Sequence, residues 1–337
     1  MTHRCQSSSP VTAFVTVEGT YKARQLTQQA MVVRVGYLGP AGTYSHEAAI
    51  QQFPSDLYKD VEFIPQKSIG ACFTSVQDGS IDYAMVPLEN STNGQVVFTY
   101  DFFRDWFMNK EYEEPNFKVV AEQFVSIHHN LITFADDVKD ITRIYSHPQV
   151  WTQCWAFLQS HELDNGLRVE KMDTSSTSRA VELVSQLAPD DPLRRCTAAI
   201  ASKTASEVHS VPIKVSHVED DAANTTRFLC ISSKDIEDAG NGKVESNSSS
   251  KMHLLAFALK NTDNTRQGAL CDVLERFREN GLNLQSITTR PAKSGRPWEY
   301  VFFVETWDGS LGAVDQCVQE ISTIVDNVQL MGSFIRE

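Results

Sequence analysis

Short apolar runs alternate with helix-periodic segments over the first two thirds of the chain. Residues 32–38 form an apolar run that ends at a Gly-Pro-Ala-Gly turn, which predicts a buried strand. Thr43 and Ser68 each precede a segment whose apolar positions recur every three to four residues, so each is predicted to cap a helix. Further strands are expected over residues 81–87, 117–125, 130–134 and 141–145. This alternation predicts open α/β lobes with largely parallel sheets, in which a ligand lies beyond the carboxyl ends of the strands.

A further helix is expected after the last of these strands. Pro148 suits the first position of a helix, because proline lacks the N–H group that is unpaired there. The helix is expected to bury one stripe of side chains at helical spacing: Trp151, Cys154, Trp155 and Leu158.

A polar run separates this region from the last part of the chain. Residues 238–251 are rich in Gly, Asn and Ser, a composition typical of flexible linkers. Beyond them, strands are predicted over 252–259, 282–287, 300–306 and 328–334, with helices over 268–280 and 311–324. The order βαββαβ within roughly 85 residues is that of a ferredoxin-like unit. The predicted parts are a disordered tail (1–31), a two-lobed unit (32–234), a linker (235–251) and a C-terminal unit (252–337).

Composition narrows the class of protein. The 337 residues are 41% hydrophobic and 22% charged, as in ordinary globular proteins, and no apolar run approaches the roughly 20 residues that span a bilayer. The net charge of −13 argues against nucleic acid as a partner, so an anion site has to use local cations and helix N-termini. The seven cysteines form no Cys-x-x-Cys pair and residues 1–30 lack a secretory signal, which together predict a cytoplasmic location; a transit peptide is the weaker alternative.

The chain lacks the common cofactor motifs. It has no GxGxxG segment after a strand, no phosphate-binding lysine loop and no HExxH. His128 and His129 look like a metal-binding pair, but neighbouring residues of a strand point to opposite faces, so the two are not expected to chelate together. No metal and no cofactor is therefore predicted.

Three polar loops carry candidate chemistry. Residues 39–45 bring hydroxyl groups to a predicted helix N-terminus, and residues 87–94 end a strand in packed hydrogen-bond donors and acceptors. Residues 146–154 place Gln149 and Gln153 four positions apart, on one helix face. For each loop taken singly, a helix cap or a solvated turn remains an alternative explanation.

A fourth polar loop, residues 220–228, runs straight into an apolar strand. Its Arg227 can grip a carboxylate with two hydrogen bonds, and the hydroxyl of Thr226 beside it can donate or accept a proton. A run of hydroxyl residues, 174–178, opens another predicted helix and is either a further anion cap or a structural one. The pairing of Thr226 with Arg227 therefore predicts an anion site at a loop-to-strand junction.

Six ordered segments resemble those of the prephenate dehydratase family. They read GPxGTYS, ENSxxG, SHPQxxxQC, STxxA, AAIAS and DxxxNxTRF, and they end at Ser45, Gly94, Cys154, Ala180, Ser202 and Phe228. The resemblance extends from about residue 32 to the chain end, because the last unit is similar to the ACT domain that follows the catalytic domain in that family. It implies a two-lobed α/β fold like that of periplasmic binding proteins, with the substrate between the lobes.

The implied reaction converts prephenate to phenylpyruvate, water and carbon dioxide in phenylalanine biosynthesis. Aromatisation of the ring drives it, so it needs a proton donor and correct placement rather than a metal or redox cofactor. In the resulting hypothesis Thr226 delivers or relays the proton to the leaving hydroxyl, and Arg227 holds a carboxylate of the substrate. Because a hydroxyl group is a weak acid, Glu89, as a partly desolvated carboxyl group, is the alternative proton source.

The resemblance implies roles for further residues of the four loops. Asn90, Ser146 and Gln153 join Thr226, Arg227 and Glu89 as predicted catalytic residues. The predicted substrate-binding residues are Thr43, Ser45, Ser91, Thr177, Asn224 and Phe228.

In the C-terminal unit, the segment Gly268, Ala269 and Leu270 matches the GAL segment of the ACT domains in this family. The family's second segment reads ESRP, and here Arg290 and Pro291 match its last two letters whereas threonines replace its Glu and Ser. The resemblance implies feedback inhibition by L-phenylalanine, and the lost carboxylate leaves the strength and identity of the effector open. Pairing of ACT domains implies a homodimer or homotetramer.

Two other functions are alternatives. Arogenate dehydratase catalyses the same chemistry on the transaminated substrate, but the sequence offers no acidic residue that is assignable to the additional ammonium group. A non-catalytic amino-acid sensor would have the same two kinds of binding unit, but it has no evident need for Thr226 beside Arg227.

Overall fold

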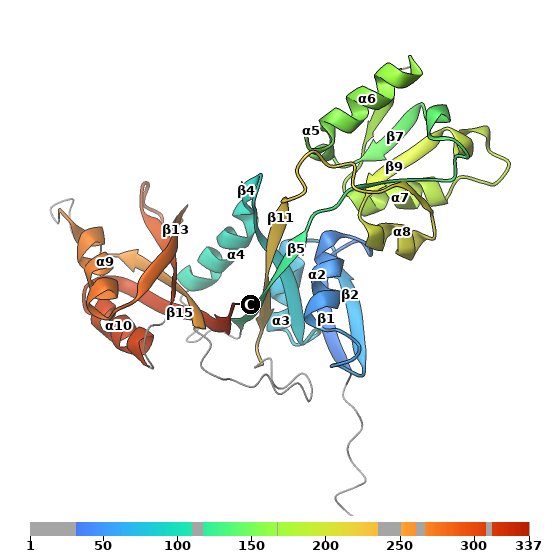
Figure 1. Ribbon diagram of the computed structural model, residues 1–337. Helices are drawn as coiled ribbons and strands as arrows, with labels where there is room; N and C mark the ends of the chain where they lie inside the picture. The colour runs from blue at the N-terminus through green and yellow to red at the C-terminus, as the bar shows by residue number, and fades with distance from the viewer. Residues whose placement is uncertain are drawn as a thin grey trace, which may run out of the picture. The chain divides into compact units, whose positions relative to one another are not determined.

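The computed structural model describes residues 32–109, 117–166, 168–234, 251–260, 267–307 and 312–336 (Figure 1). The predicted disordered tail and all but the last residue of the predicted linker lie outside these residues. From Val33 onward the chain forms one contact-linked unit. No helix among the described residues is long and apolar enough to cross a membrane.

The first lobe is built on strands of a large mixed sheet. Its strands are β1 (Val33–Leu38), β2 (Val61–Gln66), β3 (Tyr83–Asn90), β5 (Lys118–Ser126) and β11 (Thr225–Ser232), with the short β4 (Gly94–Gln95) paired to β3. β1 runs parallel to β2 and β3, whereas β11 is antiparallel to both β3 and β5. The prediction of largely parallel sheets is therefore wrong here. β5 leads the chain out of this lobe and β11 leads it back, so the two must run in opposite directions.

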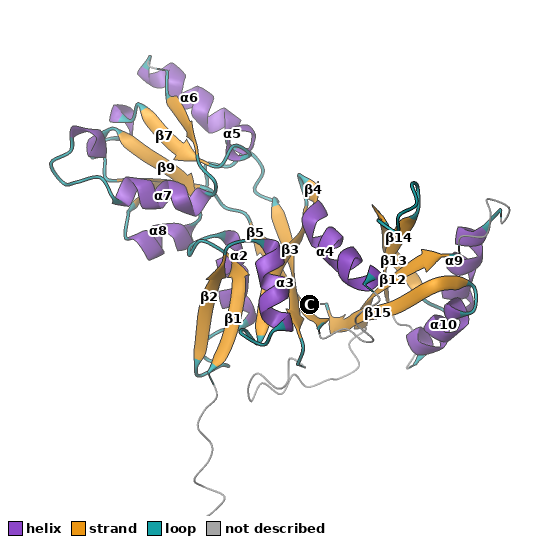
Figure 2. Ribbon diagram, turned by 180° about the vertical axis from the view of Figure 1, so that it is seen from behind, coloured by secondary structure: helices purple, strands orange, loops and turns teal. Residues whose placement is uncertain are grey.

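Three helices cover the two faces of this sheet (Figure 2). Helix α2 (Tyr44–Gln52) packs Ala48 and Ala49 on one face, and α3 (Ile69–Gln77) and α4 (Val97–Met108) pack on the other. The side chains of Thr43 and Ser68 accept hydrogen bonds from backbone N–H groups in the first turns of α2 and α3, which confirms both predicted N-caps.

The second lobe has its own five-stranded sheet, in the order β10 (Ile213–Val215), β6 (Asn130–Thr133), β9 (Thr197–Ala201), β7 (Arg143–Ser146) and β8 (Glu170–Asp173). Strands β7, β8 and β9 are parallel, and β6 is antiparallel to β9 and β10. Helices α5 (Val150–Gln153) and α6 (Trp155–Asn165) cover one face, and α7 (Thr177–Ser185) and α8 (Lys203–His209) cover the other. Two 3-10 turns, Val138–Asp140 and Pro192–Arg195, lie in the connections.

The helix that was predicted to start at Pro148 has a different start and is interrupted in the structure. It starts at Val150, and it breaks at Cys154, so that two helices replace one. The Asp220 carboxylate accepts hydrogen bonds from the backbone N–H groups of Trp155 (2.9 Å) and Ala156 (3.0 Å), which begins a new helix there. The break turns Trp155 outward, where it is 60% exposed, so its predicted burial is wrong; Cys154 and Leu158 are buried as predicted.

The C-terminal unit has the predicted order βαββαβ. Its elements are β12 (Lys251–Leu259), α9 (Ala269–Glu279), β13 (Asn283–Pro291), β14 (Tyr300–Trp307), α10 (Ala313–Ser322) and β15 (Val325–Ile335). Both helices pack on one face of its four strands, and the other face shares a core with α3 and α4 of the first lobe. The unit begins at Lys251, one residue earlier than predicted.

The C-terminal strands continue the sheet of the first lobe, because β15 pairs with β5 at Gly332 and Val119. A Cβ atom at position 332 would lie 2.1 Å from the carbonyl oxygen of Val119. Such a contact is impossible for a side chain, so the junction between the two units requires glycine at this position.

The chain passes between the two lobes twice. Residues 127–129 lead from β5 to β6, and residues 216–224 lead from β10 back to β11. Both connections are short and lie next to each other, since the backbone N–H of Val218 donates to the carbonyl of His129 at 2.8 Å. These two segments are the covalent connections between the lobes.

Candidate active site

The predicted polar loops follow the carboxyl ends of parallel strands in both lobes. Residues 39–45 follow β1, and residues 89–94 include the end of its parallel neighbour β3, so both lie at one edge of the first sheet. Ser146, residues 174–178 and Ser202 follow or end β7, β8 and β9, which are also parallel neighbours. The carboxyl edge of each sheet therefore carries the hydroxyl and amide groups that the sequence singled out.

Hydrogen bonds bring the two edges into contact. The hydroxyl of Ser202 donates to the carbonyl of Gly42 at 2.9 Å, and the hydroxyl of Ser178 donates to the carbonyl of Ala41. Gly42 has a φ of +86°, and a Cβ there would lie 2.8 Å from Cα of Ala205. Glycine is thus required both by the backbone conformation and by the close approach of the second lobe.

Thr43 and Ser45 support this contact from the first lobe. The hydroxyl of Thr43 donates to the carbonyl of Leu38 at 2.8 Å and accepts from the N–H of His46 at 3.3 Å, so it acts as a cap. Ser45 is buried in the first turn of α2. Their predicted contact with a substrate remains a prediction.

Asn90 connects two of the predicted loops. Its Oδ1 accepts from the N–H groups of Thr92 (3.0 Å) and Asn93 (2.9 Å), which fixes the orientation of the amide. Its Nδ2 donates to Oδ1 of Asn224 (2.7 Å) and to the hydroxyl oxygen of Thr226 (2.9 Å). Because the oxygen of half-buried Thr226 accepts this bond, its own proton remains to be donated to another group.

The antiparallel pairing of β3 with β11 holds this arrangement together. Residues Asn90 and Thr226 are partners in the ladder. Next to them, Oγ of Ser91 accepts from the N–H of Thr225 at 2.9 Å, and the carbonyl of buried Asn224 accepts from the N–H of Ile127 at 2.8 Å. Loops 89–94 and 220–228 are thus one structural site. Its hydroxyl groups come from strand ends rather than from free loops.

Arg227 is engaged by three carboxylates of the protein. Its Nε lies 2.7 Å from Oε2 of Glu122, its Nη1 lies 2.9 Å from Oε1 of Glu89, and its Nη1 and Nη2 both bond to Glu305 of β14. Burial of the side chain, which is 4% exposed, opposes its charge, but the bonds to Glu305, Glu122 and Glu89 outweigh burial and raise the pKa of Arg227. These bonds use four of the five N–H groups of the guanidinium, so a substrate carboxylate that binds it with two hydrogen bonds has to replace one of these partners.

The partners of Arg227 differ in exposure. The side chain of Glu89 is 41% exposed, whereas those of Glu122 and Glu305 are 1% and 3% exposed. Burial opposes ionisation of Glu305, but its hydrogen bonds with Arg227 outweigh burial and lower the pKa of that carboxyl group. Glu89 is therefore the partner that a ligand can displace at the smallest cost.

Gln153 belongs to a second network, at the lobe connection. Its side-chain amide lies 2.8 Å from Nε2 of His129, whose Nδ1 lies 3.0 Å from the hydroxyl of Tyr44. Tyr44 in turn donates to the carbonyl of His128 at 2.9 Å. Burial lowers the pKa of His129, so its ring is neutral near pH 7. This network ties α2 of the first lobe to α5 of the second.

Three other predicted residues take structural positions. The buried hydroxyl of Ser146 donates to the carbonyl of Ile200 at 2.7 Å. Thr177 is buried at the start of α7, where the neighbouring Ser176 is the N-cap. Phe228 lies in the core between β11 and α2. Direct roles for these three in binding a substrate are not evident from their contacts and remain predictions.

The predicted effector residues lie on both sides of the C-terminal sheet. Gly268, with a φ of +84°, precedes α9, whose first turn contains Ala269 and Leu270. Arg290 faces the other way, and its Nε lies 2.7 Å from Oδ1 of Asp101 in α4. Pro291 ends β13 at an exposed position. The segment that resembles ESRP therefore contacts the first lobe.

Sequence reasoning missed three buried carboxylates: Glu122, Glu305 and Glu219. Glu122 and Glu305 lie in apolar stretches, where a carboxylate is unusual unless it is paired, and that was the available signal. Glu219 stands among polar and acidic residues, so nothing in the sequence indicates its burial. Burial opposes ionisation of Glu219, but its hydrogen bonds with His128 and backbone N–H groups outweigh burial and lower its pKa.

The family model and the curated relatives that match this chain name the same family. The model of the family "Prephenate dehydratase" matches residues 35–236. A probable prephenate dehydratase of Saccharomyces cerevisiae is 40% identical over 296 residues, covering 81% of this chain and 86% of that protein. A bifunctional chorismate mutase/prephenate dehydratase of Stutzerimonas stutzeri is 32% identical over 81% of this chain, which spans 65% of its length.

A solved structure shares the fold. The prephenate dehydratase from Arthrobacter aurescens, determined in complex with L-Phe, has a TM-score of 0.71 and 24% identity, covering 90% of each chain. The βαββαβ order of the C-terminal unit and the α/β lobes are thus confirmed as fold features. By the family match and the 40% identity, the chain belongs to the prephenate dehydratase family of lyases.

Proposed function

We propose that this chain converts prephenate to phenylpyruvate between the two carboxyl edges, with Thr226 as the proton relay. The observation that carries the proposal is the bond from Asn90 to the oxygen of Thr226, which leaves the Thr226 proton to be donated at the edge where both lobes meet. Preorganised donors of this kind act where charge develops in the transition state.

The chemistry balances with one proton. The bond from the ring carbon to the hydroxyl oxygen breaks, and that oxygen leaves as water after it takes a proton. The bond to the ring carboxylate breaks at the same time, its electron pair completes the aromatic ring, and carbon dioxide leaves. Thr226 passes its proton to the leaving oxygen and takes one in return from solvent, so it acts as a relay. Glu89, whose carboxyl oxygen accepts a bond from Arg227 in this structure, is the alternative source of the returning proton.

The two substrate carboxylates need positive partners in a chain of net charge −13. We propose that one of them takes the place of Glu89 at Nη1 of Arg227, since Glu89 is the most exposed of its three partners. The second is proposed to lie at the N-terminus of α7, where the residue Thr177 adds a hydroxyl group to the unpaired backbone N–H groups.

Inhibition by L-phenylalanine is proposed to act through the C-terminal unit. Support comes from the resemblance of residues 268–270 and 290–291 to ACT segments and from the ion pair of Glu305 with Arg227, next to Thr226. Strand β13 is the last strand of the large sheet among the described residues, and such an edge suits pairing in a homodimer or homotetramer. Cytoplasmic location is proposed from the sequence.

The test is phenylpyruvate formation, read by its absorbance in alkali, from purified protein with prephenate; phenylalanine formation from arogenate is measured in parallel. Turnover of prephenate that falls on addition of phenylalanine is the expected result. Turnover of arogenate alone would assign the chain to arogenate dehydratases. Binding of phenylalanine without turnover of either substrate would make it a sensor and remove Thr226 from any mechanism.

A further inference from the structure

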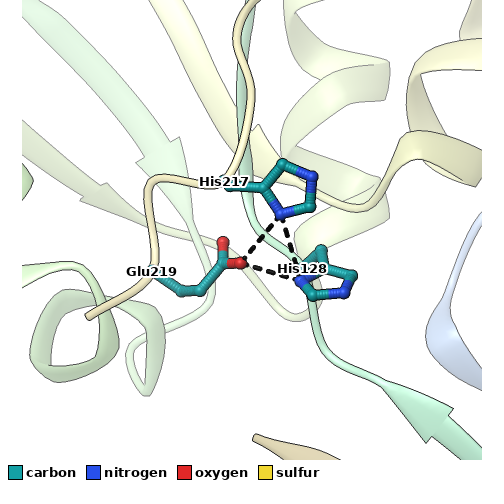
Figure 3. Close-up of side chains that lie close together, drawn as sticks. All are labelled: His128, His217 and Glu219. Atoms are coloured by element: carbon teal, nitrogen blue, oxygen red, sulfur yellow. Dashed lines mark hydrogen bonds and ion pairs between the residues drawn. The ribbon is translucent and has the colours of Figure 1, made fainter. Parts of the chain in front are cut away.

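Three side chains converge where the chain crosses between the lobes (Figure 3). His128 lies on the outward connection, and His217 and Glu219 lie on the return connection. Nδ1 of His128 is 2.8 Å from Oε1 of Glu219, and Nδ1 of His217 is 3.2 Å from both of these atoms. In the sequence, the histidine next to His128 is His129, but in the fold the partners of His128 in this cluster are His217 and Glu219.

The triangle has the size of one face of a metal coordination polyhedron. At metal–ligand distances of about 2.0–2.1 Å, two ligand atoms lie about 2.9 Å apart when they subtend a right angle, and about 3.3 Å apart in a tetrahedron. The three separations of 2.8, 3.2 and 3.2 Å fall close to this range. A metal ion would therefore find its three donors already spaced for it.

The backbone holds these donors in place. His217 has a φ of 57°, in the left-handed region that residues other than glycine rarely occupy, and this conformation is sustained by its surroundings. Glu219 is 2% exposed, and its Oε2 accepts from the backbone N–H of His129 at 2.8 Å. That bond leaves Oε1 to the two imidazoles, as outer hydrogen bonds do in metal sites.

Exposure leaves room for a metal and its water ligands. The side chain of His217 is 62% exposed and that of His128 is 39% exposed, so the cluster is open to solvent on the histidine side. Two imidazoles with one carboxylate are the donor set of many Zn²⁺ sites in which water completes the coordination.

We propose that Nδ1 of His128, Nδ1 of His217 and Oε1 of Glu219 bind a divalent zinc-class metal ion at the junction of the lobes. The ion joins the two connections, so it restrains the movement of one lobe against the other. Through the N–H of His129, whose ring contacts Gln153, the site is also continuous with the network at the start of the second lobe. The proposal does not depend on which substrate the enzyme takes.

The test is equilibrium dialysis of the full chain against Zn²⁺ at pH 7.5, with metal measured by mass spectrometry and thermal unfolding followed alongside. His217→Gly is the informative variant, because glycine adopts a φ of 57° freely, so the variant removes a ligand without adding strain. His128→Ala is the second variant. Cys271→Ser is the matched control, since the exposed thiol of Cys271 is a competing ligand.

The expected result is one equivalent of Zn²⁺ in the parent chain and in Cys271→Ser, with a rise in the unfolding temperature. Loss of even an outer hydrogen-bond partner of a metal ligand weakens binding by about 10- to 100-fold, so both histidine variants, which remove a ligand, should bind at least that much more weakly and lose that rise. The proposal is overturned by equal binding in His217→Gly, by loss of binding in Cys271→Ser, or by no binding at millimolar Zn²⁺. In the last case the triangle is a hydrogen-bonded cluster only.

Discussion

Replacing Arg227 by methionine should destabilise the chain far more than removing an exposed arginine. Methionine keeps much of the volume of the side chain but removes the charge that Glu122 and Glu305 face at 1% and 3% exposure. Glu122 keeps its pair with Arg336, whereas Glu305 keeps the hydroxyl of Ser286 at 2.6 Å. Breaking a buried ion pair by removing one partner costs about 3–5 kcal/mol.

The assay is urea unfolding followed by tryptophan fluorescence. With a slope of about 2–3 kcal/mol per molar urea, a loss of about 3–5 kcal/mol moves the midpoint down by about 1–2.5 M. Arg143→Met is the matched control, because Arg143 pairs with Glu170 at 2.7 Å but the two side chains are 29% and 54% exposed. That pair should contribute about 0–1 kcal/mol. Equal midpoints for the two variants would refute the claim that the buried ion pairs of Arg227 stabilise the fold more than an exposed ion pair does.

The same cluster predicts how the stability difference depends on pH. The folded protein lowers the pKa of Glu305 from its ordinary value of 4.5, because its hydrogen bonds with Arg227 outweigh burial. The stabilisation is therefore complete above pH 4.5 and fades as the pH falls below that value. The gap in midpoint between the parent chain and Arg227→Met should accordingly narrow in acid, and a gap that widens below pH 4.5 would contradict this assignment.

Three further predictions concern the site and the sheet. Thr226→Val should lower kcat by roughly 10²–10⁴ with an unchanged fold, whereas Thr225→Val, one position away, should change it little; steady-state kinetics with prephenate decide. Asn90→Asp keeps an acceptor for the turn but cannot donate to the Thr226 oxygen, so kcat should fall at least about tenfold. Gly332→Ala puts a methyl group 2.1 Å from the Val119 carbonyl and should lower stability by about 1–3 kcal/mol, measured by thermal unfolding.

The features that the sequence predicted well are local ones. The caps at Thr43 and Ser68 depend on a side chain and the three residues that follow it, so they can be read without knowledge of the fold. The βαββαβ order likewise follows from periodicity within each segment. The outward turn of Trp155 could not be predicted, because it depends on a cap from Asp220, 65 residues further along the chain.

The candidate site was predicted as separate loops and not as an arrangement. The motif residues Asn90 and Thr226 were both singled out, but their bond joins residues 136 positions apart, through an antiparallel strand pairing that the prediction of largely parallel sheets missed. The partners of Arg227 were harder still. Glu122 and Glu305 lie in β5 and β14, and a glutamate in a predicted strand gives no sign of which cation it will meet.

Arg227 joins the first lobe and the C-terminal unit through buried ion pairs. One residue from Thr226, its guanidinium bonds to a carboxylate of the first lobe and to Glu305 of the C-terminal unit. A ligand that shifts β14 has to stretch or break the buried, charge-assisted bonds between Glu305 and Arg227. The free-energy cost of moving β14 relative to β11 is therefore on the order of kilocalories per mole rather than tenths of a kilocalorie. Coupling of this kind is reciprocal: if phenylalanine weakens prephenate binding through Glu305, prephenate must weaken phenylalanine binding by the same factor.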